Sequence, residues 1–296
     1  MPDEAGAKRA AGMQVAKTIA EVRQWVSAAR AAGKQVGLVP TMGALHVGHV
    51  SLIEAATERC DFVVVSIFVN PTQFGPNEDL AKYPRPFEED VAICEENGVA
   101  VVFAPSPEGM YGGGGVTWVT VEKLTAPLCG RSRPTHFRGV TTVCTKLFNI
   151  VGPDVAFFGQ KDAQQAIVIK RMVAELNMPL EIVVCPTVRE ADGLAVSSRN
   201  RYLNEQERRD ATALYRSLQK CQGMIEAGTK DAGEIRAAMV AILEEVPKLE
   251  IEYVSLVDAE SLEEIEWVER RVLVAVAARL GPARLIDNIL VDAAAQ

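Results

Sequence analysis

Residues 36–69 read VGLVPTMGALHVGHVSLIEAATERCDFVVVSIFV, and this stretch decides the fold. Its first four residues form an apolar run that ends at Pro40, as a buried strand would. Residues 49–60 have helical apolar spacing, and residues 62–69 form a β-branched run that is apolar on both faces. A strand without a polar face suits the middle of a parallel sheet that helices cover on both sides. The stretch therefore predicts a β-loop-α-β unit.

The same alternation continues outward from this unit. Helical spacing precedes it at residues 19–32 and returns at 88–97, 141–151 and 162–176, whereas strands are expected at 100–104, 155–159 and 182–184. Strands that alternate with helices indicate an open parallel sheet with right-handed crossovers. We predict a Rossmann-like α/β domain over residues 13–186, with helices on both faces of the sheet.

The pattern changes from about residue 187. A charged helical segment at 204–227 is followed by strands at 251–257 and 272–277 that lack long helical crossovers. We predict a smaller C-terminal α+β domain over residues 187–296, with a loop that can close over a triphosphate like a lid. Residues 1–12, MPDEAGAKRAAG, are small and polar without the apolar stretch of a secretory signal, so we expect a flexible tail.

Composition excludes several classes of protein. The 296 residues carry a formal net charge of −8, which offers no basic face for nucleic acid. No run approaches the roughly 18 apolar residues of a membrane helix. The six cysteines are scattered without a C-x-x-C pair, as is usual for reduced thiols. We predict a cytoplasmic protein that binds neither nucleic acid nor a membrane.

Two of the three histidines, His46 and His49, lie three residues apart where the first strand should lead into a helix. Ligands of open α/β sheets bind at the carboxyl ends of strands, and a helix N-terminus offers unpaired N–H groups to an anion. Gly43 and Gly48 would let the backbone approach a phosphate closely. Zinc would need further ligands at convincing spacing, so the loop favours phosphate over metal.

Two later loops have similar chemistry. In residues 158–165, FGQKDAQQ, Lys161 could meet a phosphate and Asp162 a ribose hydroxyl, although Asp162 could equally be a helix N-cap. In residues 192–200, DGLAVSSRN, two hydroxyls and a guanidinium lie on a glycine-containing loop that could close over a triphosphate. A solvated turn is the alternative for that loop.

Taken together, seven strings resemble one family, the pantoate–β-alanine ligases (pantothenate synthetases), within the HxGH nucleotidyltransferase and class I synthetase-like superfamily. In chain order they are VPTMGALHVGH, VSIFVNPTQF, YPRPFEED, RPTHFRGV, FFGQKDAQQ, PTVREADGLAVSSRNRYL and RLIDNI. The resemblance covers residues 18–288. It implies ATP-dependent joining of (R)-pantoate to β-alanine through an enzyme-held pantoyl adenylate, with release of pyrophosphate and AMP.

The resemblance also implies roles for single residues. His49 would be a proton donor, and His46, Lys161, Ser197, Ser198 and Arg199 would stabilise charge on the reacting phosphates. Val188 would contact adenosine through its backbone. The full set implied to bind ATP is Met42, Gly43, Ala44, Leu45, His46, Val47, Gly48, His49, Gly159, Gln160, Lys161, Asp162, Val188, Val196, Ser197, Ser198 and Arg199.

Gln73 and Gln165 match the family residues that hold pantoate, whose hydroxyls and carboxylate suit amide groups. Asn70 and Arg133 match neighbouring substrate motifs, as does His136. Asn70 could instead be a turn former before a proline, and Arg133 an ion-pair or loop residue.

Mg²⁺ is expected to accompany ATP, with Asp90 as the candidate ligand and Glu89 as a weaker candidate. The alternative is that these two carboxylates only form the polar face of a helix. Gln160 stands where the family often has Glu, and Val196 where Leu or Met is usual. The resemblance further implies a homodimer.

Other readings share parts of this pattern. A cytidylyl- or adenylyltransferase has the same HxGH loop, but Gln73 and Gln165 argue for pantoate. An aminoacyl-tRNA synthetase would need a tRNA-binding extension. A non-catalytic nucleotide sensor could keep the fold and lose the reaction.

Overall fold

The structure is a computed structural model that describes residues 12–76 and 78–293. The tail predicted at residues 1–12 lies outside the described residues except for Gly12. The described chain divides into two compact units. Unit 1 comprises residues 12–120, 135–158 and 169–185, and unit 2 comprises residues 121–134, 159–168 and 186–293. Each unit is considered by itself.

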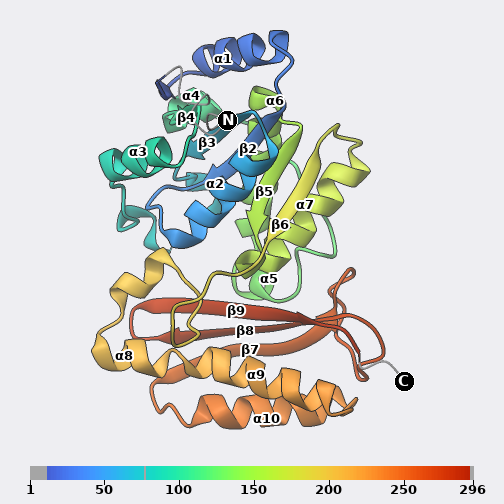
Figure 1. The fold of residues 1–296 in the computed structure, drawn as a ribbon. Helices are drawn as coiled ribbons and strands as arrows, with labels where there is room; N and C mark the ends of the chain where they lie inside the picture. The colour runs from blue at the N-terminus through green and yellow to red at the C-terminus, as the bar shows by residue number, and fades with distance from the viewer. Residues whose placement is uncertain (1–11, 77, 294–296) are drawn as a thin grey trace, which may run out of the picture. The chain divides into compact units, whose positions relative to one another are not determined.

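Unit 1 is built on a six-stranded sheet (Figure 1). Its strands are β1 (Gln14–Ala16), β2 (Val36–Thr41), β3 (Phe62–Ile67), β4 (Val101–Phe103), β5 (Val155–Gly159) and β6 (Glu181–Cys185), in the spatial order β1-β4-β3-β2-β5-β6. The pairs from β1 through β5 are parallel. Because the chain moves outward from β2 to β3 and β4 and then returns to β5, the topological switch point lies between β2 and β5.

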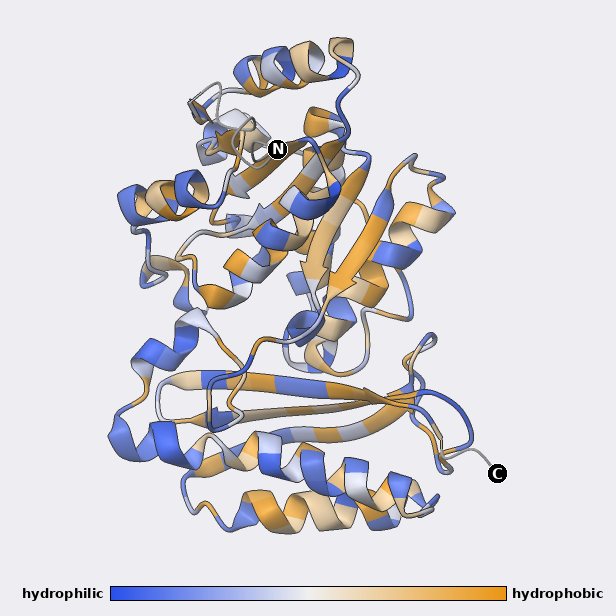
Figure 2. Ribbon diagram, in the orientation of Figure 1, coloured by the Kyte–Doolittle hydropathy of each residue, from blue (hydrophilic) through white to orange (hydrophobic). Residues whose placement is uncertain are grey.

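Helices cover this sheet on both faces, as predicted. They are α1 (Ile19–Ala31), α2 (Val47–Arg59), α3 (Phe87–Glu96), α4 (Pro107–Tyr111), α6 (His136–Val151) and part of α7 (Ala163–Glu175), with 3-10 turns η2 (Pro71–Gln73) and η3 (Asp79–Ala81). Val39 and Val65 are buried in one cluster with Ile53 of α2. Side chains alternate along a strand, so Leu38 and Val64 face the opposite layer, where α1 and α6 pack together. In Figure 2 most of β5 is apolar, as a strand buried on both faces requires.

Unit 2 contains an antiparallel sheet of β7 (Leu249–Asp258), β8 (Val272–Leu280) and β9 (Ala283–Val291), in that order. Its helices are α5 (Cys129–Ser132), α8 (Glu205–Asp210), α9 (Ala213–Glu226) and α10 (Ala232–Glu244), with 3-10 turns η4 (Gln160–Asp162) and η5 (Ser198–Tyr202). Leu214 and Leu218 of α9 join Met239 of α10 and Leu256 and Val274 of the sheet in one buried core. The predicted α/β fold with a smaller α+β part is confirmed.

Several elements of unit 2 differ from the sequence prediction, among them the short helix α5, which was not predicted. The single helix expected at 204–227 is two helices, α8 and α9, separated at Ala211 and Thr212. Helix α10 was not predicted, although Asp231 marks its start by accepting hydrogen bonds from two backbone amides of the first turn. Strand β9 was not predicted either, since the adjacent buried residues Asp287 and Asn288 interrupt its apolar alternation.

Among the described residues, no helix is long and apolar enough to cross a membrane.

Candidate active site

The HxGH loop of unit 1 comprises residues 42–49. It follows the end of β2 at the topological switch point of the sheet. Thr41 ends the strand, and its hydroxyl donates to the Ser66 carbonyl at 2.7 Å while accepting from the Gly43 amide at 3.1 Å. Beyond Met42, Gly43 and Ala44 have positive φ values of 78° and 51°. This reversal delivers His46 to the N-cap position of α2, with its carbonyl accepting from the Val50 amide. The loop thus presents a helix N-terminus at the carboxyl edge of the sheet, which suits an anion.

The two histidine rings of this loop stack on each other, with 4.0 Å between ring centroids and 30° between ring planes. The Nδ1 atom of His49 accepts a hydrogen bond from the His46 backbone amide at 3.3 Å. A neutral imidazole that accepts at Nδ1 has its proton on Nε2, so this bond makes the far nitrogen of His49 a donor. A side chain on Gly48 would lie 3.1 Å from the His46 ring, so glycine gives the ring room over the first helical turn.

Asp90, the sequence candidate for a magnesium ligand, binds this loop instead of facing open space. It lies on α3 and is 1% exposed. Its Oδ2 atom accepts from the Ala44 amide at 2.8 Å, and Oδ1 accepts from the Leu45 amide at 2.7 Å. Within residues 12–76 and 78–293, no group of three His, Cys, Asp or Glu side chains is arranged to hold a metal. The Asp90 carboxylate therefore holds two consecutive backbone amides of the HxGH loop.

The turn η2 places the predicted pantoate residue Gln73 beside the HxGH loop. Gln73 is buried, and its amide nitrogen lies 3.0 Å from the sulfur of Met42. Its amide oxygen accepts from Asn70 at 3.0 Å, and its carbonyl oxygen lies 2.9 Å from Nδ1 of His136. Unit 1 thus brings together four of the residues singled out in the sequence: Met42, Asn70, Gln73 and His136.

Tyr111, the last residue of α4, contacts this turn and was missed by sequence reasoning. Its hydroxyl donates to Oδ1 of Asn70 at 2.7 Å and lies 3.2 Å from the Thr72 hydroxyl. Burial raises the pKa of the Tyr111 phenol, so the group stays a neutral donor. Asn70 uses both ends of its side chain inside the protein, because its amide nitrogen also donates to the Gly139 carbonyl at 3.2 Å. No local signal in the surrounding GMYGGGG string marks Tyr111, since its partners lie about forty residues away.

Gly139 is where α6 passes closest to this turn. A Cβ atom there would lie 2.4 Å from the Thr72 carbonyl oxygen and 2.7 Å from Cα of Gln73. We expect Gly139→Ala to push the turn away and raise the KM for pantoate by about tenfold or more, because small displacements of positioning groups are costly. Steady-state kinetics with varied pantoate and then varied ATP would measure this. Gly223→Ala, in α9 where the added atom meets nothing within 4 Å, is the control. Equal KM increases for both substrates would contradict a specific effect on the turn.

Gly159 ends β5, and Gln160, Lys161 and Asp162 form the 3-10 turn η4; residues 159–162 are called the Lys161 loop. The Lys161 ammonium lies 3.7 Å from the Asp162 carboxylate, and the Lys161 side chain is 22% exposed. Gln165, on the first turn of α7, is half-buried, and Arg133 ends α5. Next to Gln165, Gln164 is a structural residue: its amide accepts from the Cys129 amide and donates to two carbonyls, those of Leu124 and Pro127.

The second loop of unit 2 is a short hairpin that leads to Ser197. The Val196 amide donates to the Val188 carbonyl at 3.0 Å, and Arg189 pairs with Ala195 as an antiparallel bridge. Ser197 caps η5 by accepting from the Arg199 amide at 3.3 Å. Ser198 and Arg199 therefore begin the 3-10 turn η5.

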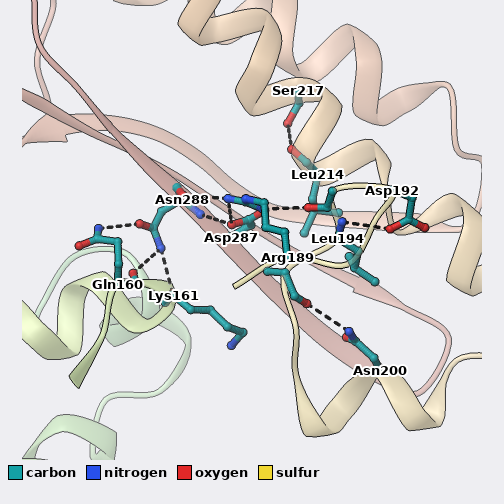
Figure 3. A network of polar contacts seen from close by, with 12 residues as sticks. Gln160, Lys161, Arg189, Asp192, Leu194, Asn200, Leu214, Ser217, Asp287 and Asn288 are labelled. Atoms are coloured by element: carbon teal, nitrogen blue, oxygen red, sulfur yellow. Dashed lines mark hydrogen bonds and ion pairs between the residues drawn. The ribbon is translucent and has the colours of Figure 1, made fainter. Parts of the chain in front are cut away.

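Two arginines hold this hairpin in place. Arg208 of α8 donates to Asp192 at 2.7 Å and to Glu190 at 2.6 Å, and it lowers the pKa of the Asp192 carboxyl. Arg189 forms a bidentate pair with Asp287 of β9 at 2.6 and 3.0 Å (Figure 3). The Arg189 guanidinium also lies 4.1 Å from the Tyr215 ring centroid. Arg189, Arg208 and Asp287 were not assigned roles from the sequence, because only their partners reveal them.

A parallel α/β sheet with an HxGH loop at its switch point defines the class of HxGH-type nucleotide-binding enzymes. Comparison with known sequences narrows this class. A sequence model of the pantoate–β-alanine ligases matches residues 14–290, and the chain belongs to this family. It is 55% identical to a pantothenate synthetase of Moorella thermoacetica over 95% of this chain and 99% of the relative.

Solved structures of this family also resemble the chain. A pantothenate synthetase of Thermus thermophilus superposes with a TM-score of 0.89 at 45% identity, covering 94% of this chain and 99% of that one. A pantoate–β-alanine ligase of Francisella tularensis, complexed with β-γ ATP and β-alanine, has a TM-score of 0.78 at 33% identity over 94% of this chain and 98% of that one.

Proposed function

We propose that this chain condenses (R)-pantoate with β-alanine at the expense of ATP, giving pantothenate, AMP and pyrophosphate. A carboxylate is a poor acylating agent, so its oxygen first attacks the α-phosphorus of ATP and expels pyrophosphate. The amine of β-alanine then attacks the acyl carbon of the pantoyl adenylate, AMP leaves, and an amide forms. Family membership over nearly the whole chain supports this reaction.

One observation in unit 1 carries the proposal. Gln73, which would hold pantoate, contacts Met42 of the HxGH loop, which would hold ATP. A pantoate bound by Gln73 would therefore lie next to the HxGH loop, where ATP would bind. Catalysis of this kind depends mostly on positioning and on stabilising charge that develops on oxygen. We assign Asn70 and Tyr111 to holding Gln73.

The remaining roles follow the resemblance. His49 would donate from Nε2 to a phosphate oxygen while His46 contacts the same phosphates, and Lys161, Ser198 and Arg199 would offset negative charge as pyrophosphate leaves. Asp162 and the Val188 backbone would contact adenosine. Gln165 and Arg133 would contact pantoate or β-alanine.

We propose that Mg²⁺ enters with ATP, bound by phosphate oxygens and water. We assign the Asp90 carboxylate to holding the HxGH loop, because each of its oxygens accepts a hydrogen bond from a backbone amide of that loop. No step of the reaction is assigned to Asp90 through a metal.

Three further expectations are part of this proposal. The enzyme would work in the cytoplasm as a homodimer, which light scattering of the purified chain would test. Residues 13–186 would form the nucleotide- and pantoate-binding domain and residues 187–296 the smaller domain with the lid function. The substrates would be small molecules, with no nucleic acid or membrane partner.

The adenylation half-reaction tests the function directly. We expect labelled pyrophosphate to exchange into ATP when Mg²⁺ and (R)-pantoate are present without β-alanine, and we expect no exchange when pantoate is omitted. Adding β-alanine should then release AMP in a one-to-one ratio with pantothenate. Folded protein that binds ATP but shows no pantoate-dependent exchange would overturn the proposal and favour a nucleotide sensor.

A further inference from the structure

Strand β9 carries two adjacent polar residues that are nearly inaccessible to solvent, Asp287 at 3% exposed and Asn288 at 5%. Side chains of neighbouring residues on a strand point to opposite faces. Burying two polar groups in succession is unfavourable unless each finds hydrogen-bond partners. Their partners therefore show why polar residues occur at these positions.

Asn288 binds the backbone of the Lys161 loop. Its amide nitrogen donates to the carbonyl oxygens of Gln160 and Lys161 at 3.0 and 2.9 Å, and its amide oxygen accepts from the Gln160 side chain at 2.9 Å. Both amide hydrogens are used on two consecutive carbonyls (Figure 3). These contacts fix the backbone from which the Lys161 side chain extends.

Asp287 binds the base of the other loop, the hairpin that leads to Ser197. Its two carboxylate oxygens accept from the Arg189 guanidinium, which also donates to the Gly193 carbonyl at 3.0 Å. Gly193 lies at the turn of that hairpin with a φ of 91°. The Arg189 contacts thus hold both the strand and the turn of the hairpin to β9.

The two anchors are also joined to each other. The Asn288 backbone amide donates to Oδ1 of Asp287 at 2.8 Å, and the Asn288 carbonyl accepts from Arg189 at 3.5 Å. A displacement of either loop would therefore strain the other through one dipeptide. Salt bridges and hydrogen bonds that are buried in this way tolerate little freedom of geometry.

We propose that Asp287 and Asn288 are positioning residues that hold the Lys161 loop and the Ser197–Arg199 loop at a set spacing, so that both meet one triphosphate. The inference rests on the proposed function, which gives those loops their phosphate-binding role. Neither residue touches the reacting atoms. Asn288 acts through the backbone of Lys161, and Asp287 acts through Arg189.

The test uses Asn288→Leu, which removes the amide at similar volume without adding charge, and Asn288→Asp, which turns an acceptor toward the two carbonyls. The control is Asp231→Ala, which removes the N-cap of α10 elsewhere in unit 2. We expect both Asn288 variants to raise the Kd for ATP, measured by titration calorimetry, by about ten- to a hundredfold. Asp231→Ala should lower the melting temperature by about as much as the Asn288 variants do, but it should leave the Kd for ATP unchanged.

A double-mutant cycle separates positioning from general destabilisation. If Asn288 acts through Lys161, Asn288→Leu should weaken ATP binding strongly in the wild-type background and by less than about twofold in a Lys161→Ala background. Additive effects, or an unchanged Kd in folded Asn288→Leu protein, would overturn the inference. Calorimetry with ATP alone needs no pantoate, so its outcome is independent of whether the proposed condensation is correct.

Discussion

Replacing His49 by alanine is expected to reduce pantoate-dependent pyrophosphate exchange by about 10²–10³, the usual cost of losing one donor to a developing oxyanion. The expectation rests on the hydrogen bond from the His46 amide to Nδ1 of His49, which leaves the proton on Nε2. The proton donor therefore points away from the backbone. Initial exchange rates at saturating ATP and pantoate would measure the loss.

Two conservative variants distinguish whether Nδ1 or Nε2 of His49 contributes to the exchange activity. His49→Gln places an amide donor near the position of Nε2, whereas His49→Asn places an acceptor near Nδ1 and lacks a donor at the far position. We expect His49→Gln to retain more exchange activity than His49→Asn by about tenfold, the order of effect of one hydrogen bond to a charged group. The reverse order would show that holding the loop, and not donating a hydrogen bond from Nε2, is the main role of His49.

Replacing Asp90 by alanine is expected to lower the free energy of unfolding by about 3–5 kcal/mol, because two amides of the HxGH loop lose a carboxylate partner while staying buried. One of them belongs to Ala44, whose φ of 51° is unfavourable for a residue with a side chain. Without Asp90 this strained turn should relax, and exchange activity should fall together with stability. Urea denaturation and the exchange assay would measure the two losses.

Asp90→Asn separates this role from magnesium binding. The amide keeps one acceptor for the loop and turns a donor toward the other backbone N–H, so we expect a lower midpoint of urea unfolding with an unchanged magnesium requirement. Glu89→Gln, on an exposed neighbour in the same helix, should alter neither. A large rise in the magnesium concentration needed for half-maximal exchange, without loss of stability, would instead make Asp90 a metal ligand.

The amino-acid sequence alone was enough for the fold class and for the position of the HxGH loop between a strand and a helix. Both are encoded locally. The alternation of apolar runs in residues 36–69 sets strand, helix and strand, and the three-residue spacing of His46 and His49 places both rings on the first turn of one helix. Strand β9 escaped this reasoning because Asp287 and Asn288 break the alternation on which strand prediction depends.

Only the tertiary structure decided what several of these residues do. The sequence made Asp90 a candidate metal ligand, and only the structure shows that its two oxygens accept hydrogen bonds from amides 46 and 45 residues away. Asn288 lies 127 residues from the Lys161 carbonyl that it binds, and Tyr111 lies 41 residues from Asn70. Periodicity and motif spacing describe neighbours along the chain. Hydrogen bonds between distant side chains depend on how the elements pack, and that packing determines which atom of a polar residue meets which partner.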